Sequence, residues 1–331
     1  MNRTCLNALF AGALLIAPAW AQAQQPAGGA PAAATDTTPR EPPSNDAAQV
    51  SVDMYIGDAN KAPAHVSHDV MFTQAILTAG DPQHPTAPGA VLQYNKEIVL
   101  ATLPGHNVTP LTQLPEQIIL YVESGMGRLD DGKSFWDLKP NTAVLIPPNM
   151  VHRMIATTDA PLRMLMLSRT LEPSVTPRKD ILVRDVDKLA LTERNVHWSN
   201  ESKYVFLGPD GLFPSDRILI VYMGPMTIAG PHAHTPGQEE AWVKVSEGPA
   251  LMQMGSELRP WPSNVGFIAP PNGKTVHAAI NNSPEIATWF YFARLQPNPP
   301  VNATPRPTPP AIAEGLKLAT IPGRPLPPEA K

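Results

Sequence analysis

The chain has 331 residues, which is long enough for two domains with separate hydrophobic cores. It carries 25 Lys and Arg against 29 Asp and Glu. This formal net charge of −4 gives no electrostatic reason to expect a nucleic acid or an anionic membrane as a partner. The 41 prolines are more than the usual share, and they gather at the two ends and between strand-like runs. This composition favours a β protein with flexible tails.

The first 23 residues have the features of a secretory signal peptide. Arg3 provides a positive start, an apolar stretch follows from Leu6 to Trp20, and Ala21-Gln22-Ala23 offers a small–x–small cleavage site. Since a membrane-spanning helix needs roughly 20 apolar residues and this stretch is shorter, we expect cleavage and no anchor. The protein is therefore predicted to be periplasmic or secreted, with no membrane attachment after signal cleavage.

The only cysteine, Cys5, lies within this signal, so the mature protein would contain none. That excludes disulfides and thiolate ligands, and it leaves His and carboxylate as the strong metal-ligand types. Residues 24–48 consist mainly of Ala, Pro, Thr and Gly and cannot bury enough apolar surface to fold. We expect a disordered linker there and a Pro-rich tail over residues 298–331.

The region between these tails contains one unit used twice. Residues 116–125 match residues 239–248, and residues 147–149 match residues 270–272, both at an offset of 123. His152 then aligns with His277, and Arg169 with Arg294, at an offset of 125. Such an ordered series indicates duplication. We expect an N-terminal barrel over 49–172, a connection over 173–198 and a C-terminal barrel over 199–297.

Each unit contains short strand-like runs and almost no helical periodicity. The runs are Ile118 to Val122, Ala143 to Ile146 and Leu162 to Leu167 in the first unit, and Ile218 to Met223, Ala241 to Val245, Gly266 to Ala269 and Ile286 to Phe292 in the second. Asp131-Gly132 between two apolar runs predicts a two-residue hairpin turn, because both positions tolerate positive φ. Many short strands with regular turns favour a sandwich or a small barrel.

The second unit holds a pattern typical of a metal site. His232 and His234 are two residues apart, so on a strand both rings point to the same face, which in a closed barrel is the interior. Glu239 and His277 supply a carboxylate and a third imidazole. Such a set suits one divalent ion (Fe, Mn, Ni, Cu or Zn) and leaves positions open for water or substrate. We therefore expect one metal ion per chain.

These residues resemble the two motifs of the cupin family. The resemblance is carried by His232, His234 and Glu239 for the first motif, and by Gly266, Pro271, Gly273, His277 and Asn281 for the second. It covers both halves and implies an all-β fold of two tandem antiparallel cupin (jelly-roll) barrels, a bicupin. Glu240 stands beside Glu239 and leaves open which acid binds. Glu239 is preferred as ligand and as the catalytic residue, because it aligns with Glu116.

The first unit has lost part of this ligand set. At the offset of 123, His232 falls on Thr109 and His234 falls on Leu111. Glu116 and His152 remain, and we interpret them as a remnant in a structural barrel or a pocket. No metal is expected in this half.

The remaining polar residues are interpreted as structural or exposed. His65, His68, His84 and His197 have no partners at ligand spacing and are predicted to be surface residues. Arg169 and Arg294 occupy equivalent positions in both halves, including the half without metal. This favours a structural or dimer role over binding of a substrate carboxylate, and a homodimer is one assembly to consider.

Three kinds of chemistry are open to such a site. The first is oxidation of a small organic molecule by dioxygen, as in an oxidoreductase of dioxygenase type. The second is isomerase, lyase or decarboxylase chemistry on a sugar or an organic acid, and the third is small-molecule binding without turnover. We predict the first, as the commonest use we associate with such a site. Oxalate decarboxylation is less favoured, because those bicupins usually keep ligands in both halves.

Overall fold

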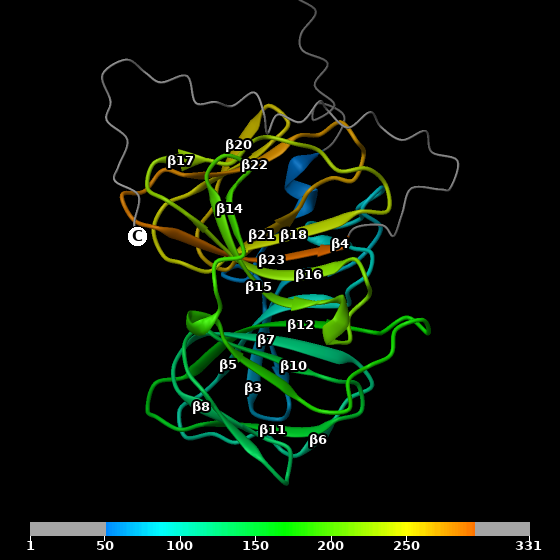
Figure 1. The fold of residues 1–331 in the computed structure, drawn as a ribbon, viewed down its shortest axis with the longest axis vertical. Helices are drawn as coiled ribbons and strands as arrows, with labels where there is room; N and C mark the ends of the chain where they lie inside the picture. Colours follow the sequence, from blue (N-terminus) through cyan, green and yellow to red (C-terminus); the bar gives the residue numbers. More distant parts are fainter. Residues whose placement is uncertain (1–50, 295–331) are drawn as a thin grey trace, which may run out of the picture. The chain divides into compact units, whose positions relative to one another are not determined.

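A computed structural model describes residues 51–294 of the protein. The predicted signal peptide (1–23), linker (24–48) and tail (298–331) lie outside these described residues. The described part consists of mostly antiparallel strands and three 3-10 helices, which confirms the all-β prediction (Figure 1). The 3-10 helices are η2 (Val52–Tyr55), η3 (Val186–Lys188) and η4 (Gly208–Asp210). Among residues 51–294, no helix has the length and apolar character needed to span a membrane.

The N-terminal half is built from a large and a small sheet. In spatial order the large sheet contains β13 (Leu182–Asp185), β10 (Thr142–Ile146), β7 (Gln117–Ser124), β12 (Leu162–Arg169), β5 (Glu97–Leu103), β3 (Met71–Ala79) and β2 (Ala64–Ser67), with β4 (Ala90–Leu92) parallel to β3. The small sheet contains β6 (Thr112–Gln113), β11 (Val151–Ala156), β8 (Gly127–Asp130) and β9 (Phe135–Leu138).

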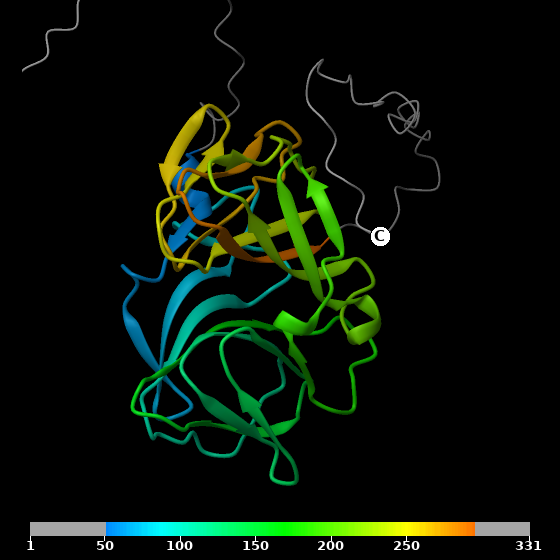
Figure 2. The ribbon, with the colours of Figure 1, turned by 60° about the vertical axis from the view of Figure 1, so that its left-hand side comes forward.

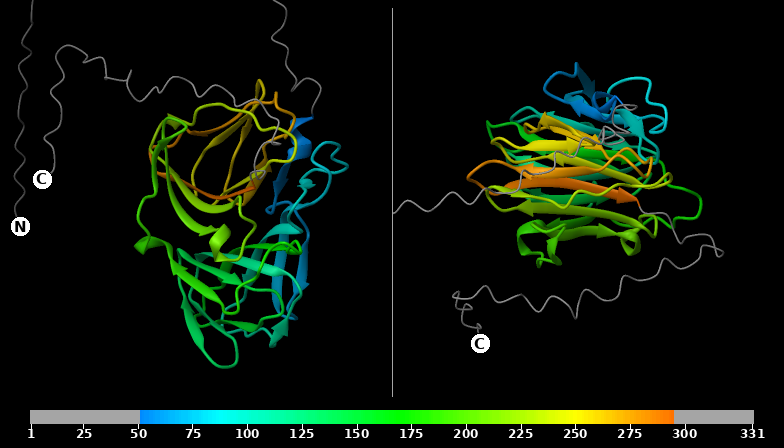
Figure 3. Two further views of the ribbon diagram at one scale, coloured as in Figure 1. Left: turned by 45° about the vertical axis from the view of Figure 1, so that its right-hand side comes forward. Right: turned by 90° about the horizontal axis from the view of Figure 1, so that it is seen from above.

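The C-terminal half repeats this arrangement. Its large sheet contains β1 (Ile56–Asp58), β21 (Val265–Ile268), β18 (Glu239–Lys244), β23 (Ala287–Arg294), β16 (Asp216–Met223), β15 (Asn200–Leu207) and β14 (Glu193–Val196). The small sheet contains β17 (Thr227–Ile228), β22 (His277–Asn281), β19 (Leu251–Met254) and β20 (Glu257–Pro260). Seen in Figure 3 (left), these strands curve around a common interior, so the prediction of two tandem antiparallel barrels is confirmed.

The seven strand-like runs of the sequence all form strands within two residues of their predicted bounds. The predicted hairpin also forms, between β8 and β9, but its turn has four residues and not two, because Asp130 pairs with Phe135. Gly132 adopts a φ of +84°, as expected for this turn. The longer loop is stabilised by the Asp131 carboxylate, which accepts the backbone N–H of Ser134.

Each large sheet takes its edge strand from a segment outside its own half of the chain. β1 precedes the other strands of the N-terminal half in the sequence but pairs with β21 of the C-terminal barrel. β13 lies in the predicted connection but pairs with β10 of the N-terminal barrel. These strands cover sheet edges that would otherwise present unpaired backbone groups. Strand β1 thus belongs to the C-terminal sheet although it lies within residues 49–172, and β13 belongs to the N-terminal sheet although it lies within residues 173–198.

The two large sheets pack against each other, as Figures 1 and 2 show. One buried cluster joins side chains from both: Ile98, Leu100, Ile119, Tyr121, Leu145, Leu165 and Leu167 from the N-terminal half, and Ile218, Ile220, Ala241, Val243, Phe290 and Phe292 from the C-terminal half. The rings of Tyr121 and Phe290 lie 6.3 Å apart. Because strand side chains alternate, the opposite face of each sheet lines its own barrel interior.

Buried charges also join the two halves. Arg169 of β12 forms an ion pair with Asp216 of β16 at 2.5 Å, and both side chains are fully buried. Burial raises the pKa of Asp216, although the charge of Arg169 opposes this shift. Arg294 pairs with Glu172, and its guanidinium lies 4.0 Å from the centre of the Tyr94 ring. The two equivalent arginines therefore connect the barrels.

Replacing Arg169 by Met should lower the free energy of unfolding by about 3–5 kcal/mol, because Asp216 would stay buried without its partner. Urea denaturation followed by circular dichroism measures this loss. The double variant R169M/D216L removes both charges and should recover most of the stability. A single variant as stable as the unmodified protein would show that the ion pair does not stabilise the interface.

Candidate metal centre

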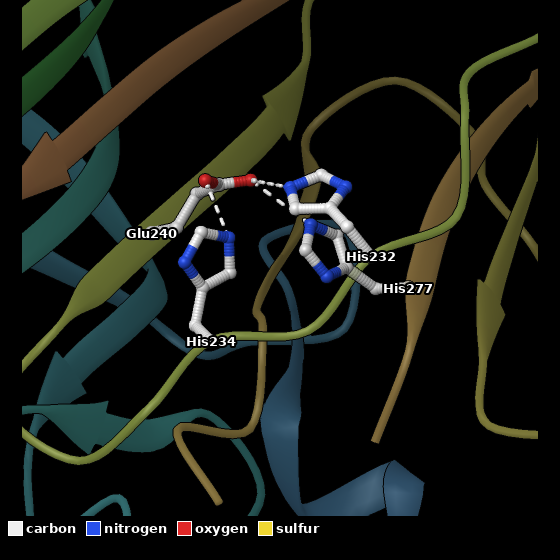
Figure 4. A group of neighbouring side chains, drawn as sticks. All are labelled: His232, His234, Glu240 and His277. Atoms are coloured by element: carbon white, nitrogen blue, oxygen red, sulfur yellow. Dashed lines mark hydrogen bonds and ion pairs between the residues drawn. The ribbon is translucent and has the colours of Figure 1, made fainter. Parts of the chain in front are cut away.

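Three histidines and one glutamate meet inside the C-terminal barrel (Figure 4). His232 forms an isolated antiparallel bridge with His277, the first residue of β22, and His234 follows two residues later. Glu240 projects from β18 toward these rings. One ligand atom from each of the four residues lies within 4.8 Å of the others. The predicted grouping of His232, His234 and His277 is therefore present, although His232 and His234 lie outside the named strands.

The carboxylate of Glu240 is the centre of this group. It lies 2.8 Å from Nε2 of His234, 2.9 Å from Nε2 of His277 and 3.9 Å from Nε2 of His232. It also accepts hydrogen bonds from Nε1 of Trp242 at 2.6 Å and from the hydroxyl of Tyr291 at 3.0 Å. Each carboxylate oxygen thus has one aromatic donor and one imidazole near it, Trp242 and His277 at Oε1 and Tyr291 and His234 at Oε2.

Two of the three rings are oriented by their other nitrogen. Nδ1 of His232 lies 3.1 Å from the carbonyl oxygen of Gly230, and Nδ1 of His234 lies 3.1 Å from Oε1 of Gln238. Both partners are acceptors, so Nδ1 carries a proton in both rings, and Nε2 is the nitrogen on the side of Glu240 that a metal ion would bind. Partners of this kind commonly orient metal-binding histidines.

Burial and hydrogen bonding shift the pKa values of the group in different directions. Burial lowers the pKa of His232 and of His277, which favours their neutral forms. Burial also opposes charge on His234, but the hydrogen bond to Glu240 outweighs it and raises the pKa of His234. Burial alone would raise the pKa of Glu240, yet hydrogen bonds from His234 and His277 hold it well below its usual range. Glu240 is therefore ionised.

The preference for Glu239 as ligand and catalytic residue is corrected by this geometry. Successive strand residues point to opposite faces, so Glu239 faces away from the histidines and toward the N-terminal half. Its carboxylate accepts hydrogen bonds from the backbone N–H groups of Gln93 and Tyr94 and from the side-chain amide of Asn95. Burial raises the pKa of Glu239 to about 7, against the effect of these donors. Glu239 thus connects the barrels, and Glu240 belongs to the metal centre.

Strand pairing also corrects the comparison with the N-terminal half. Thr112 pairs with His152 as His232 pairs with His277, so His232 corresponds to Thr112 and not to Thr109. Leu114, two residues further on, then corresponds to His234 in place of Leu111. The residue equivalent to Glu240 is also apolar. In the N-terminal half, three of the four ligand positions therefore lack a metal-binding side chain.

The residue equivalent to Glu240 is identified from the two equivalent arginines, Arg169 and Arg294. Arg294 pairs with Glu239, and Arg169 pairs with Gln117, so the next residue, Ile118, corresponds to Glu240. Ile118 is 3 % exposed and belongs to the apolar core of the N-terminal barrel. Among the described residues, the predicted remnant of Glu116 and His152 does not form a ligand group.

The two residues of this remnant have separate environments. Glu116 pairs with Lys96 at 2.8 Å. His152 is buried, with Nδ1 lying 2.9 Å from the carbonyl oxygen of Met150. Its ring centre lies 6.0 Å from that of His68.

Two of the predicted surface histidines contact other histidines. The ring of His197 is exposed but stacks on His232, with centres 4.1 Å apart and planes 6° apart. His68 is half-buried beside His152. His65 and His84 are exposed, as predicted. No sequence spacing indicated the position of His197, because it depends on a turn in which both His197 and Trp198 adopt positive φ.

The donor set fits a divalent metal ion. Nε2 of His232 is buried and has no hydrogen-bond partner, and Nε2 of His234 and of His277 lie 2.8 Å and 2.9 Å from the ionised carboxylate of Glu240. Three imidazoles with one carboxylate are ligands that Fe, Mn, Ni, Cu and Zn accept. Among the described residues, this is the one group of histidine and acidic side chains whose ligand atoms converge in this way.

Comparisons with known proteins agree with this architecture. Residues 94–172, within the N-terminal half, match the AraC-like ligand binding domain family. AerE from Microcystis aeruginosa is 15 % identical with a TM-score of 0.55, and the match covers 73 % of this chain and 100 % of AerE. The glyoxylate-induced protein from Pseudomonas aeruginosa is 13 % identical with a TM-score of 0.57, covering 75 % and 90 %.

Oxalate decarboxylase OxdC from Bacillus subtilis is 11 % identical with a TM-score of 0.53, and the match covers 72 % of this chain and 76 % of that protein. The protein has a cupin fold. At these identities the similarity concerns the fold alone. A comparison with curated proteins gave no match.

The assignment of the two neighbouring acids predicts different effects for matched substitutions. Glu240→Gln should lose bound metal, because a neutral amide replaces the only carboxylate of the group. Glu239→Gln should keep the metal and lower the free energy of unfolding by about 1–3 kcal/mol, because its donors lose a charged acceptor. Metal analysis after loading and urea denaturation measure the two effects. The reverse pattern would restore Glu239 as the ligand.

Proposed function

We propose that the C-terminal barrel is the active site of a mononuclear metal-dependent enzyme, an oxidoreductase of dioxygenase type that acts on a small organic molecule. The proposal rests on one observation, the convergence of three imidazole Nε2 atoms on the buried carboxylate of Glu240. A divalent metal held by these residues would supply a Lewis acid or redox centre with coordination positions left for substrate. A periplasmic or secreted location and cleavage of the signal peptide remain part of this proposal.

The residues around the group have defined tasks in such an enzyme. Trp242 and Tyr291 fix the carboxylate of Glu240 through their hydrogen bonds, so its orientation does not change when a substrate enters. Next to them lies a cavity of about 100 Å³, lined by both aromatic rings and by His197. Its lining includes the exposed His197, so a small molecule can enter it from solvent. A substrate in this cavity would lie beside the metal ligands.

Two alternatives belong to the same site. Oxalate decarboxylase from Bacillus subtilis, which shares the fold, contains Mn(II) centres, and a Lewis-acid reaction on an organic acid is therefore an alternative to oxidation. Binding without turnover is the other alternative, since residues 94–172 match a family described as ligand binding. The measurements described below distinguish Lewis-acid chemistry and binding without turnover from the proposed oxidation.

Metal-loaded protein should contain about one divalent ion per chain, because within the part of the chain that the structure describes only the C-terminal half has converging donors. Elemental analysis after gel filtration measures the ratio. His234→Ala should reduce it to near zero, whereas the matched control His152→Ala, a buried histidine of the N-terminal half, should leave it unchanged. Two ions per chain would contradict the loss of ligands at Thr112, Leu114 and Ile118.

Oxygen consumption distinguishes the chemistry. With metal-loaded protein, at least one member of a panel of phenols, diketones and thiol acids should consume dioxygen, and His234→Ala should abolish the uptake. Transformation of a compound under nitrogen at an unchanged rate would replace oxidation by Lewis-acid chemistry. Compounds that raise the melting temperature but are recovered unchanged would indicate binding alone.

A further inference from the structure

Of the three imidazoles in the metal centre, that of His232 is the least constrained by Glu240. Its Nε2 atom lies 3.9 Å from the Glu240 carboxylate, against 2.8 Å for His234 and 2.9 Å for His277. Its side chain is also 26 % exposed, whereas those of His234 and His277 are 10 % and 2 % exposed. It belongs to no named strand and joins the sheet through a single bridge to His277. The orientation of its ring therefore depends on contacts other than the carboxylate.

His197 makes two such contacts. Its ring stacks on the ring of His232, with centres 4.1 Å apart and planes 6° apart. Its carbonyl oxygen accepts the backbone N–H of Gly230 at 2.6 Å, and the carbonyl oxygen of Gly230 in turn lies 3.1 Å from Nδ1 of His232. His197 thus covers one face of the imidazole and also holds the backbone group to which that imidazole is bonded.

The turn that carries His197 has an unusual backbone and is closely packed. It joins β14 to β15, and His197 and Trp198 adopt positive φ values of +46° and +76°. Such values are uncommon for residues with a β-carbon, and they persist where surrounding contacts enforce them. A β-carbon on Gly230 would lie 3.1 Å from the Trp198 ring, so this ring rests directly on the glycine backbone. The turn is therefore held over Gly230, beside His232.

The N-terminal barrel has an equivalent turn, but it has no metal ligand to stack on. Strands β3 and β2 end the N-terminal large sheet as β15 and β14 end the C-terminal one. Between β2 and β3, His68 and the residue after it also adopt positive φ, so His68 corresponds to His197. Because Thr112 replaces the ligand in this half, His68 lies instead beside His152, with ring centres 6.0 Å apart and planes 55° apart. Parallel stacking is thus confined to the barrel that holds the ligands.

We propose that His197 is a positioning residue of the metal centre, which keeps the ring of His232 in the orientation that points Nε2 toward Glu240. This inference rests on the proposed function and deepens it, because it assigns the contact that holds the least constrained ligand. The role requires the flat ring and the backbone of His197 and no ligand atom from it. Loss of the ring leaves His232 free to rotate, and residues that orient a metal-binding histidine typically change metal affinity about 10–100-fold.

Two substitutions test this role, with Co²⁺ as the probe. His197→Ala removes the ring, whereas His197→Phe keeps a flat ring without nitrogen atoms. His197→Ala should weaken Co²⁺ binding at least about tenfold, measured by competition with a chelator of known affinity, and should change the visible absorption bands of the bound ion. His197→Phe should bind Co²⁺ within about threefold of the unmodified protein and with the same bands, because stacking requires only the ring.

The matched control is His68→Ala, which changes the equivalent turn of the N-terminal barrel and should leave Co²⁺ affinity and absorption unchanged. Unchanged affinity and absorption in His197→Ala would overturn the inference. Equal losses in His197→Phe and His197→Ala would also overturn it, because they would assign the effect to the nitrogen atoms. Co²⁺ binding that depends on the ring, without turnover of any compound, would refute the enzyme and leave the positioning role standing. Unmodified protein that takes up no Co²⁺ would refute both.

Discussion

A carboxylate that is 3 % exposed must be compensated by its surroundings, and the interior of the C-terminal barrel is organised around this requirement at Glu240. His234, His277, Trp242 and Tyr291 each contribute a contact to it. Each of its two oxygens lies near one imidazole and accepts a hydrogen bond from one aromatic side chain. The same arrangement that stabilises the buried charge therefore gathers three nitrogen ligands at one point.

Strand alternation separates the metal centre from the interface between the barrels within two adjacent residues. Glu240 projects into the barrel, whereas Glu239 projects toward the N-terminal half and accepts hydrogen bonds from residues 93–95. Substitutions can therefore remove the metal ligands of one barrel while the interface between the two barrels is retained. In the N-terminal barrel Ile118 packs into the apolar core at the position of Glu240, while Arg169 still pairs across the interface.

Much of the fold could be predicted from the sequence because it depends on local patterns. The strand runs, the duplication and the three histidines of the metal centre follow from periodicity and spacing. The choice between Glu239 and Glu240 could not be made in this way, since an offset from one repeat to the other is uncertain by a residue wherever a loop changes length. The structural pairings of Arg169 with Gln117 and of Arg294 with Glu239 resolve that offset. Contacts made by turns, such as the stacking of His197 on His232, leave no sequence pattern at all.

Anomalous X-ray diffraction from crystals of metal-loaded protein, recorded at the absorption edge of the metal found by elemental analysis, tests the central claim most directly. We expect a single anomalous peak per chain within about 2.0–2.3 Å of Nε2 of His232, His234 and His277 and of a carboxylate oxygen of Glu240. A peak that included the carboxylate of Glu239, or a peak of similar height beside His152 in the N-terminal barrel, would contradict it.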